Sequence, residues 1–144
     1  MPLITYAQQV VGSGMIAGQT FANANVLLTM NSDTSTVVKV NDRVSVNHGT
    51  LSVNVSGVEA EFGVSQIFNS QESAEAGFQP AGTGLDVLTT SNPTFATYDL
   101  TTSIGPISGT PGINPGHRFV TTDGNAFVLN SVAPQATFTA TLLG

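Results

Sequence analysis

Two histidines are the residues of this chain whose type most readily binds a metal ion. His48 and His117 are the only imidazoles among the 144 residues. A metal site would need both rings to meet a carboxylate, and neither an HxH nor an HExxH spacing occurs. Gly49 follows His48, and His117 follows a Pro-Gly pair, so both are predicted to lie in exposed turns. We therefore predict no metal site.

Glu59 and Glu61 form the one pair of carboxylates whose spacing fits hydrolytic chemistry. Two residues apart on a strand, they lie on one face with their α-carbons about 7 Å apart. Paired carboxylates can hydrolyse glycosides. Such sites hold the sugar on aromatic rings, however, and the chain has no Trp and only Tyr6 and Tyr98. A solvated strand face is the favoured interpretation.

The remaining motifs do not indicate an enzyme. There is no GxSxG, GxxxxGK[ST] or GxGxxG pattern, and Ser13 between two glycines is not a nucleophile elbow. The oxygen-rich turns at 31–33 and 123–125 each lack further calcium ligands, so turn chemistry is favoured. The sequon at 54–56 falls in a predicted strand. Because cysteine is also absent, we predict no catalytic residue and no cofactor.

Charge is scarce in this sequence. Only 8 % of the residues are charged, and three cations (Lys39, Arg43 and Arg118) face nine carboxylates, for a net charge of −6. Binding to nucleic acid or to an anionic membrane needs several cations on one face, so both partners are excluded. The polar residues are neutral instead: 19 Thr, 13 Ser and 11 Asn. Together with 40 % hydrophobic residues, this composition is typical of a folded β-protein.

The elements that must position these residues are predicted to be strands. Apolar and polar residues alternate at 51–56 and 43–47, which predicts a hairpin with its turn at His48-Gly49. A second hairpin is expected around 31–34. A strand at 59–68 carries Phe62, Val64 and Ile67 as core candidates, and the change of phase between Val64 and Ile67 indicates a bulge or a strand end.

The C-terminal half contains loops as well as strands. Residues 69–84 are predicted to form a surface loop, and 104–116, rich in Pro and Gly, an ordered loop. Strands are expected at 85–90 and 94–101. Asp123-Gly124 predicts the turn of a hairpin between 118–122 and 126–131, and 136–143 is predicted to be the final strand.

The strand pattern predicts an all-β fold, either an antiparallel β-sandwich or a jelly-roll-like barrel with an extended N-terminal arm. Residues 25–144 would form the β-domain. Residues 1–24 lack clean alternation and contain Gly12, Gly14 and Gly18, so they are expected to form the arm. An arm of this kind can cover an edge strand of a neighbouring molecule. The arm residues expected to contact a partner are Leu3, Ile4, Tyr6, Val10 and Val11.

The N-terminal segment was also compared with a secretion signal. Residues 10–17 are mildly apolar, and 22–24 (Ala-Asn-Ala) have the small-x-small form of a cleavage site. No positive charge precedes Lys39, however, and glycines interrupt the apolar stretch. We therefore expect an uncleaved protein made in the cytoplasm.

One segment carries a family resemblance. Residues 98–141 include DLTTSIGPISG, INPG, a FVTT-turn-FVLNS hairpin and a closing TFTAT strand. This third of the chain resembles the β-rich segment of many exported PEP-CTERM bacterial proteins. The resemblance implies an extracellular bacterial surface or matrix protein.

A second resemblance is one of type. A small, acidic, cysteine-free β-protein rich in Thr, Gly and Ala is similar to the capsid decoration, or cement, proteins of tailed bacteriophages. The resemblance implies a structural protein of the virion, made in the host cytoplasm. It also implies a homo-oligomer, with a trimer favoured, that binds the major capsid protein on the outer capsid surface and stabilises the particle. This is the leading hypothesis, and the extracellular surface protein is the alternative. A carbohydrate-binding module that uses Tyr98 is a third.

Overall fold

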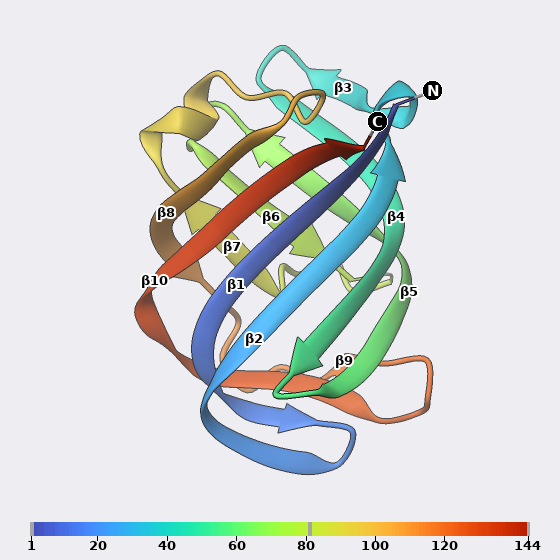
Figure 1. The fold of residues 1–144 in the computed structure, drawn as a ribbon, viewed down its shortest axis with the longest axis vertical. Helices are drawn as coiled ribbons and strands as arrows, with labels where there is room; N and C mark the ends of the chain where they lie inside the picture. Colours follow the sequence, from blue (N-terminus) through green and yellow to red (C-terminus); the bar gives the residue numbers. More distant parts are fainter. Residues whose placement is uncertain (1, 81, 144) are drawn as a thin grey trace.

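The computed structural model describes residues 2–80 and 82–143. Its elements are β1 (Leu3–Ile16), β2 (Gln19–Asp33), η1 (Thr34–Thr36), β3 (Val38–Asn41), β4 (Val44–Val55), β5 (Val58–Ser70), β6 (Glu75–Gln79), β7 (Leu88–Ser91), η2 (Pro93–Ala96), β8 (Ile104–Gly112), β9 (Phe119–Val120) and β10 (Ala126–Leu143). Figure 1 shows them in one view.

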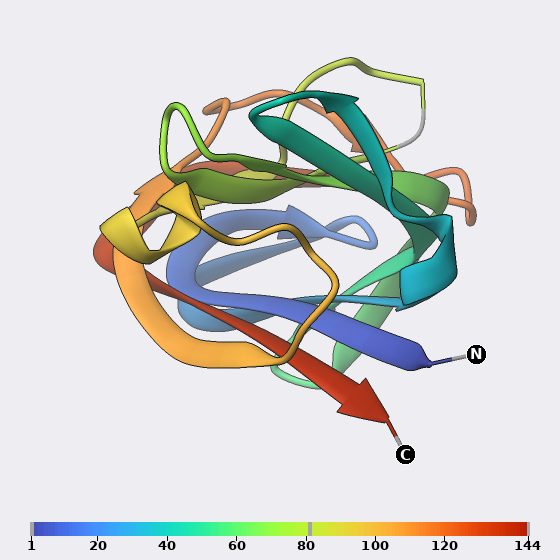
Figure 2. The ribbon, with the colours of Figure 1, turned by 90° about the horizontal axis from the view of Figure 1, so that it is seen from above.

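The strands form one closed antiparallel barrel. The eight strands of the barrel wall follow the order β1-β2-β4-β5-β6-β7-β8-β10, and β1 also pairs with β10, so the sheet closes on itself. Figure 2, a view from above, shows the strands arranged around the interior of the barrel. With 68 % of the chain in strands and 5 % in helices, the predicted all-β antiparallel fold is confirmed.

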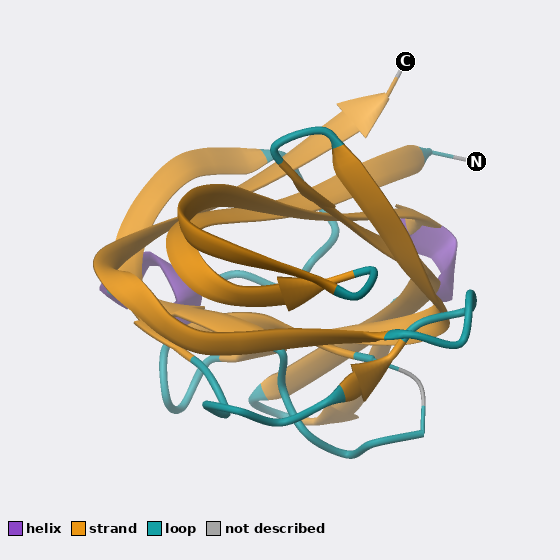
Figure 3. Ribbon diagram, turned by 90° about the horizontal axis from the view of Figure 1, so that it is seen from below, coloured by secondary structure: helices purple, strands orange, loops and turns teal. Residues whose placement is uncertain are grey.

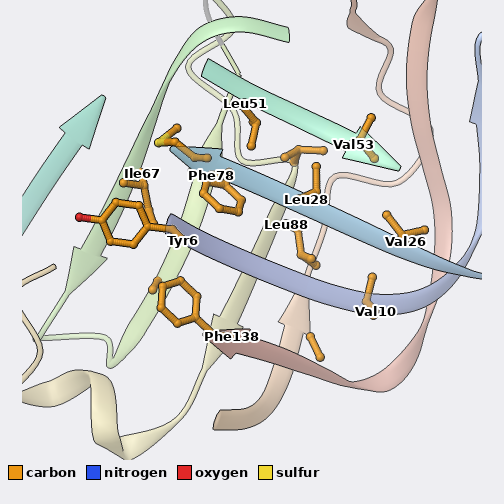
Figure 4. Packing of buried hydrophobic residues seen from close by; sticks show 14 of the residues in the cluster. Tyr6, Val10, Val26, Leu28, Leu51, Val53, Ile67, Phe78, Leu88 and Phe138 are labelled. Atoms are coloured by element: carbon orange, nitrogen blue, oxygen red, sulfur yellow. The ribbon is translucent and has the colours of Figure 1, made fainter. Parts of the chain in front are cut away.

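Alternation along the strands fills the barrel. Ile4, Tyr6 and Val10 of β1 point inward and are at most 2 % exposed. They meet residues such as Leu28 and Phe138 from the neighbouring strands (Figure 4). The interior is therefore packed with side chains, as expected for a small barrel.

The predicted N-terminal arm is wrong. Residues 3–16 form β1, which is paired along its length with β2 on one side and β10 on the other, and the expected domain boundary after residue 24 falls inside β2. The glycines that indicated an arm serve close packing. A Cβ on Gly14 would lie 1.8 Å from the Val128 carbonyl oxygen, and one on Gly12 would lie 2.9 Å from that of Ser131.

The two hairpins predicted in the first half are also wrong. β4 runs without a turn through His48 and Gly49. Gly49 instead permits a close approach to β2, because a Cβ there would lie 2.3 Å from the Asn31 carbonyl oxygen. Residues 31–33 end β2 and lead into η1, and the following β3 pairs with β4.

The bulge predicted in β5 is present but lies earlier. The pairing of β4 with β5 shifts where Leu51 pairs with Gly63 and Ser52 pairs with Glu61, which leaves Phe62 without a partner. Gly63 has the positive φ of +80° that such a bulge requires. Val64 then points outward and is 66 % exposed, so its assignment to the core is wrong.

The second half contains more sheet than the sequence predicted. Residues 75–79 form β6 inside the expected loop, and Phe78 is fully buried. Residues 104–112 form β8, and Pro106 falls where the register with β10 shifts, so its missing N–H interrupts little of the ladder. The hairpin at Asp123-Gly124 is confirmed by the pairing of β9 with β10.

The barrel is closed at both ends. Residues 94–101, predicted to be a strand, instead form most of η2 and a segment that places Phe95, Tyr98 and Leu100 against the core. The Tyr6 hydroxyl donates to the Leu100 carbonyl at 2.6 Å. At the other end the β1–β2 hairpin turns across the opening (Figure 3), and its Phe21 stacks on Phe127.

Candidate interaction surface

The five residues predicted to contact a partner divide into two groups. Ile4, Tyr6 and Val10 are buried inside the barrel and cannot reach another molecule, so this part of the prediction is wrong. Leu3 and Val11 point outward and are 53 % and 42 % exposed. Alternation along β1 separates the two groups, because successive side chains of a strand point to opposite faces.

The two histidines lie apart and do not form a site. His48 is exposed on β4, whereas His117 is half-buried, with its ring edge-on to Phe119 at a centroid distance of 4.5 Å. Within residues 2–80 and 82–143, no group of three His, Asp or Glu side chains could hold a metal ion.

The predicted pair of carboxylates lies on the outer face of the barrel. Glu59 and Glu61 are both exposed on β5. Glu59 accepts a hydrogen bond from the Asn54 side chain at 3.2 Å, which joins the two strands beside the β4–β5 turn. The geometry is that of a solvated strand face.

The acidic turns stabilise the backbone. Asp33 accepts from the Ser35 amide at 2.8 Å and caps η1, and these hydrogen bonds hold the pKa of its carboxyl below the ordinary value. Asp123 accepts from the Thr121 hydroxyl and the Asn125 amide, which likewise lower its pKa. Charge on these carboxylates therefore stabilises turns, as expected.

The two remaining motif residues have local roles. The Ser13 hydroxyl accepts from the Asn23 amide at 3.0 Å. In the sequon, the Asn54 side-chain oxygen accepts from the Gly57 amide at 3.0 Å in the turn that follows β4.

A regular array of outward side chains covers β10, β1, β2 and the second half of β4, the strands at the front of Figure 1. Cross-strand pairing places these residues in three rows of four. We call this array the threonine wall. Its rows are Thr141-Thr5-Asn31-Thr50, Thr139-Ala7-Thr29-Ser52 and Thr137-Gln9-Leu27-Asn54.

Polar groups within the threonine wall hydrogen-bond to one another. The Thr5 hydroxyl donates to the Asn31 side chain at 2.8 Å, and the Thr29 and Ser52 hydroxyls are 3.1 Å apart. Because these groups already have partners, covering them with another protein costs less than covering unpaired polar groups.

The wall and its surroundings are almost free of charge. Across the described strands β8, β10, β1, β2 and β4, the only Asp, Glu, Lys or Arg is Asp33, the last residue of β2. These five strands are neighbours in the sheet, so the uncharged region extends over more than half of the barrel circumference. Interfaces are depleted of charge at their centres, which makes this region the best candidate for an interaction surface.

Apolar residues flank the wall at both ends. Leu3 pairs with Leu143, which is 50 % exposed, and both line an open hollow of about 560 Å³ beside the chain termini. At the other end, Val11 lies next to Leu27, which is 37 % exposed. The wall is therefore polar at its centre and apolar at its ends.

The sequence contained part of this signal. In the predicted final strand, 136–143, Thr137, Thr139 and Thr141 alternate with apolar residues. Their neighbours Thr5 and Ala7 belong to the segment taken for an arm, so the array was missed. Alternation over residues 3–11 is incomplete, because the polar Gln8 points inward while the apolar Leu3 and Val11 point outward.

No family model matches the chain, and neither a curated protein nor a solved structure shows significant similarity. Among the described residues, no helix is long and apolar enough to cross a membrane.

Proposed function

We propose that this chain is a capsid decoration protein, a non-enzymatic structural protein that binds the outer surface of a viral capsid and stabilises the particle. The observation that carries the proposal is the threonine wall, which carries no charged residue and in which Thr5 and Asn31, and Thr29 and Ser52, hydrogen-bond to each other. The wall takes the role that the sequence assigned to an N-terminal arm. The major capsid protein is the proposed partner.

The size of the wall supports binding as an oligomer. With strands about 4.8 Å apart and outward residues about 6.8 Å apart, each side chain covers about 33 Å², so twelve cover about 400 Å². A standard interface buries about 800 Å² on each partner. One wall therefore contributes a weak contact, and a symmetric homo-oligomer, with a trimer favoured, gains affinity through avidity.

Co-sedimentation with particles tests the proposal. The particles are assembled from the major capsid protein encoded in the same genome as this chain. The double variant Ala7→Lys/Thr139→Lys places two charges at the centre of the wall, where burial of unpaired charge is costly. We expect it to lower the bound fraction at least tenfold. Val120→Lys, at a position 70 % exposed on β9 and outside the wall, is the control and should bind normally.

Three results would contradict the proposal. The unchanged chain could fail to sediment with the particles, the double variant could bind as well as the parent, or the genome could encode no capsid protein. Circular dichroism of both variants checks that they remain folded, as expected for substitutions of outward side chains.

The extracellular bacterial surface protein is the second candidate. It is favoured by the resemblance of residues 98–141, which contain β8, β9 and most of β10, to the β-rich segment of exported PEP-CTERM bacterial proteins. Cell fractionation separates the two functions. Recovery of the native protein from the outer surface or the matrix of a bacterial culture, and its absence from purified virus particles, would favour this candidate.

A further inference from the structure

The side of the barrel away from the threonine wall carries a hollowed outer face. One cross-strand row runs over β4 to β8 through Val46, Phe68, Gly77, Thr89 and Gly112. Two of the five positions are glycine, and the Phe68 and Thr89 side chains pack over Gly77. Two hollows lie along this row, and we call the face that carries them the glycine trough. β6 and β7, which form its centre, lie behind β1 and β2 in Figure 1.

Two adjoining hollows make up the trough. The larger, of about 380 Å³, is lined by valines of β3 and β4 and by Gln66, Phe68, Glu75, Gln79 and Asp86. The smaller, of about 220 Å³, shares Glu75 and Asp86 and continues past Thr89 to Asn114. Small-molecule sites occupy about 300–1,000 Å³, and the combined trough falls in that range.

Hydrogen-bonding groups and one aromatic ring converge on the larger hollow. Gln66 and Gln79 face each other in the register of β5 and β6, and each amide can both donate and accept. Glu75, on the same strand as Gln79, contributes an acceptor. The Phe68 ring lies beside Gly77, with one ring carbon 3.1 Å from where a Cβ would stand. An apolar platform is therefore ringed by polar groups.

Asp86 is the least satisfied group in the trough. One of its carboxyl oxygens is buried and has no hydrogen-bond partner. Burial also raises the pKa of this carboxyl, against a hydrogen bond from Gln79. A buried acceptor without a donor costs about 1–3 kcal/mol. Because the last torsion of an aspartate is broad, the carboxyl can turn its unpaired oxygen toward a donor in the hollow.

We propose that the glycine trough binds a neutral oligosaccharide. Sugar hydroxyls donate to carboxylates and also accept from amides, which matches Glu75, Asp86, Gln66 and Gln79. The C–H face of a sugar ring packs on an aromatic side chain such as Phe68. Two carboxyl groups within one trough disfavour sugars that carry carboxylate or sulfate groups.

The topology favours a ligand recognised by side chains over a peptide. β5, β6 and β7 are each paired on both sides, so the floor of the trough offers no free backbone edge. An extended peptide that adds to a sheet needs such an edge. Tyr98, which the sequence offered as the stacking residue for a sugar, is 4 % exposed and donates its hydroxyl to the Thr102 carbonyl. Phe68 replaces it in this proposal.

The experiment is a screen of the full chain on an array of neutral and acidic oligosaccharides. Isothermal titration with the strongest neutral sugar then measures affinity. Gln66→Ala and Glu75→Ala remove hydrogen-bonding groups from the trough, and each should weaken binding at least tenfold. Gln9→Ala, on the threonine wall, removes a matched side chain and should leave binding unchanged. The side-chain amide resonances of Gln66 and Gln79 should shift on titration with the same sugar.

Four results would overturn the proposal. They are an array without a hit, binding restricted to acidic sugars, an affinity that neither trough variant changes, or a loss of affinity caused by Gln9→Ala. This outcome is independent of capsid binding, because the wall and the trough share only β4, of which the wall uses residues 50–54 and the trough uses Val44 and Val46.

Discussion

The threonine wall and the glycine trough are two outer faces of one closed sheet, and they differ in how their surface is filled. The twelve positions of the wall all carry side chains, and some of these hydrogen-bond to one another. The trough has glycine at Gly77 and Gly112, with Glu75 and Asp86 beside them. A barrel fixes only its inward residues by core packing, so the outward residues of the two faces can specialise for different partners.

The largest expected effect is the loss of both faces together. Deletion of residues 2–16 removes β1, which pairs with β2 and β10 and places Ile4, Tyr6 and Val10 in the core. Each buried side chain contributes about 1.5–3 kcal/mol. Because the hydrogen bonds of β1 with β2 and β10 are also lost, the cost is comparable to the whole free energy of unfolding of a typical domain, about 5–15 kcal/mol. We expect an unfolded chain, measured by near-UV circular dichroism and by NMR dispersion.

A folded deletion variant would contradict this prediction. It would mean that the remaining strands can close without β1, and that the first strand is an arm after all. The matched control is a Thr5→Ser variant, which keeps β1 and should unfold with the same cooperativity as the parent.

Local alternation predicted most strands of this fold, but long-range pairing could not be predicted. Residues 136–143 were placed correctly, because Phe138 and Ala140 alternate with threonines. The 3–16 strand was missed because its glycines were read as flexibility. Their true reason, contact with the backbone of residues 128–131, is visible only once β1 and β10 are known to pair.

The same limit applies to the candidate surfaces. A wall built from β10, β1 and β2 joins residues at opposite ends of the chain, so no window of sequence contains it. The trough was hidden for another reason. Residues 69–84 contain Gly77, Pro80, Gly82 and Gly84, which predicted a loop, although Phe78 and its neighbours pair on both sides.

A substitution of intermediate effect tests whether packing in the trough requires a glycine at position 77. A Cβ on Gly77 would lie 2.7 Å from the Thr89 side chain and 2.8 Å from the Leu88 carbonyl oxygen. Overpacking of this kind costs about 1–3 kcal/mol. We expect Gly77→Ala to lower the free energy of unfolding by that amount in urea. Ala7→Ser, the corresponding small change on the wall, should stay within about 0.5 kcal/mol of the parent.

Equal stability of these two variants would remove the physical distinction between the faces. The neighbours of Gly77 could then move to accommodate a methyl group, and packing would not require a glycine there. A loss of stability confined to Gly77→Ala would show that the packing of Thr89 and Phe68 requires a glycine at this position.

The smallest expected effect is an opposite pH dependence of the stability contributed by one carboxyl on each face, Asp86 in the trough and Asp33 beside the wall. Burial raises the pKa of Asp86 in the trough, so the folded state disfavours its charge. Its contribution to stability is present below the unfolded pKa of about 3.9 and is lost as pH rises through the higher folded pKa. Asp86→Asn should therefore gain stability relative to the parent at pH 7, and this gain should vanish at pH 3.

Asp33, at the end of the wall, should behave in the opposite way. Hydrogen bonds from Ser35 lower its pKa, so its stabilisation is present above the unfolded pKa and is lost as pH falls through the folded pKa. Asp33→Asn should lose stability at pH 7 and approach the parent at acidic pH. Urea unfolding of both variants at each pH measures the contrast. If both variants lose stability at pH 7, burial in the trough does not disfavour the charge of Asp86. The carboxylate would then not need a hydrogen-bond donor from a ligand.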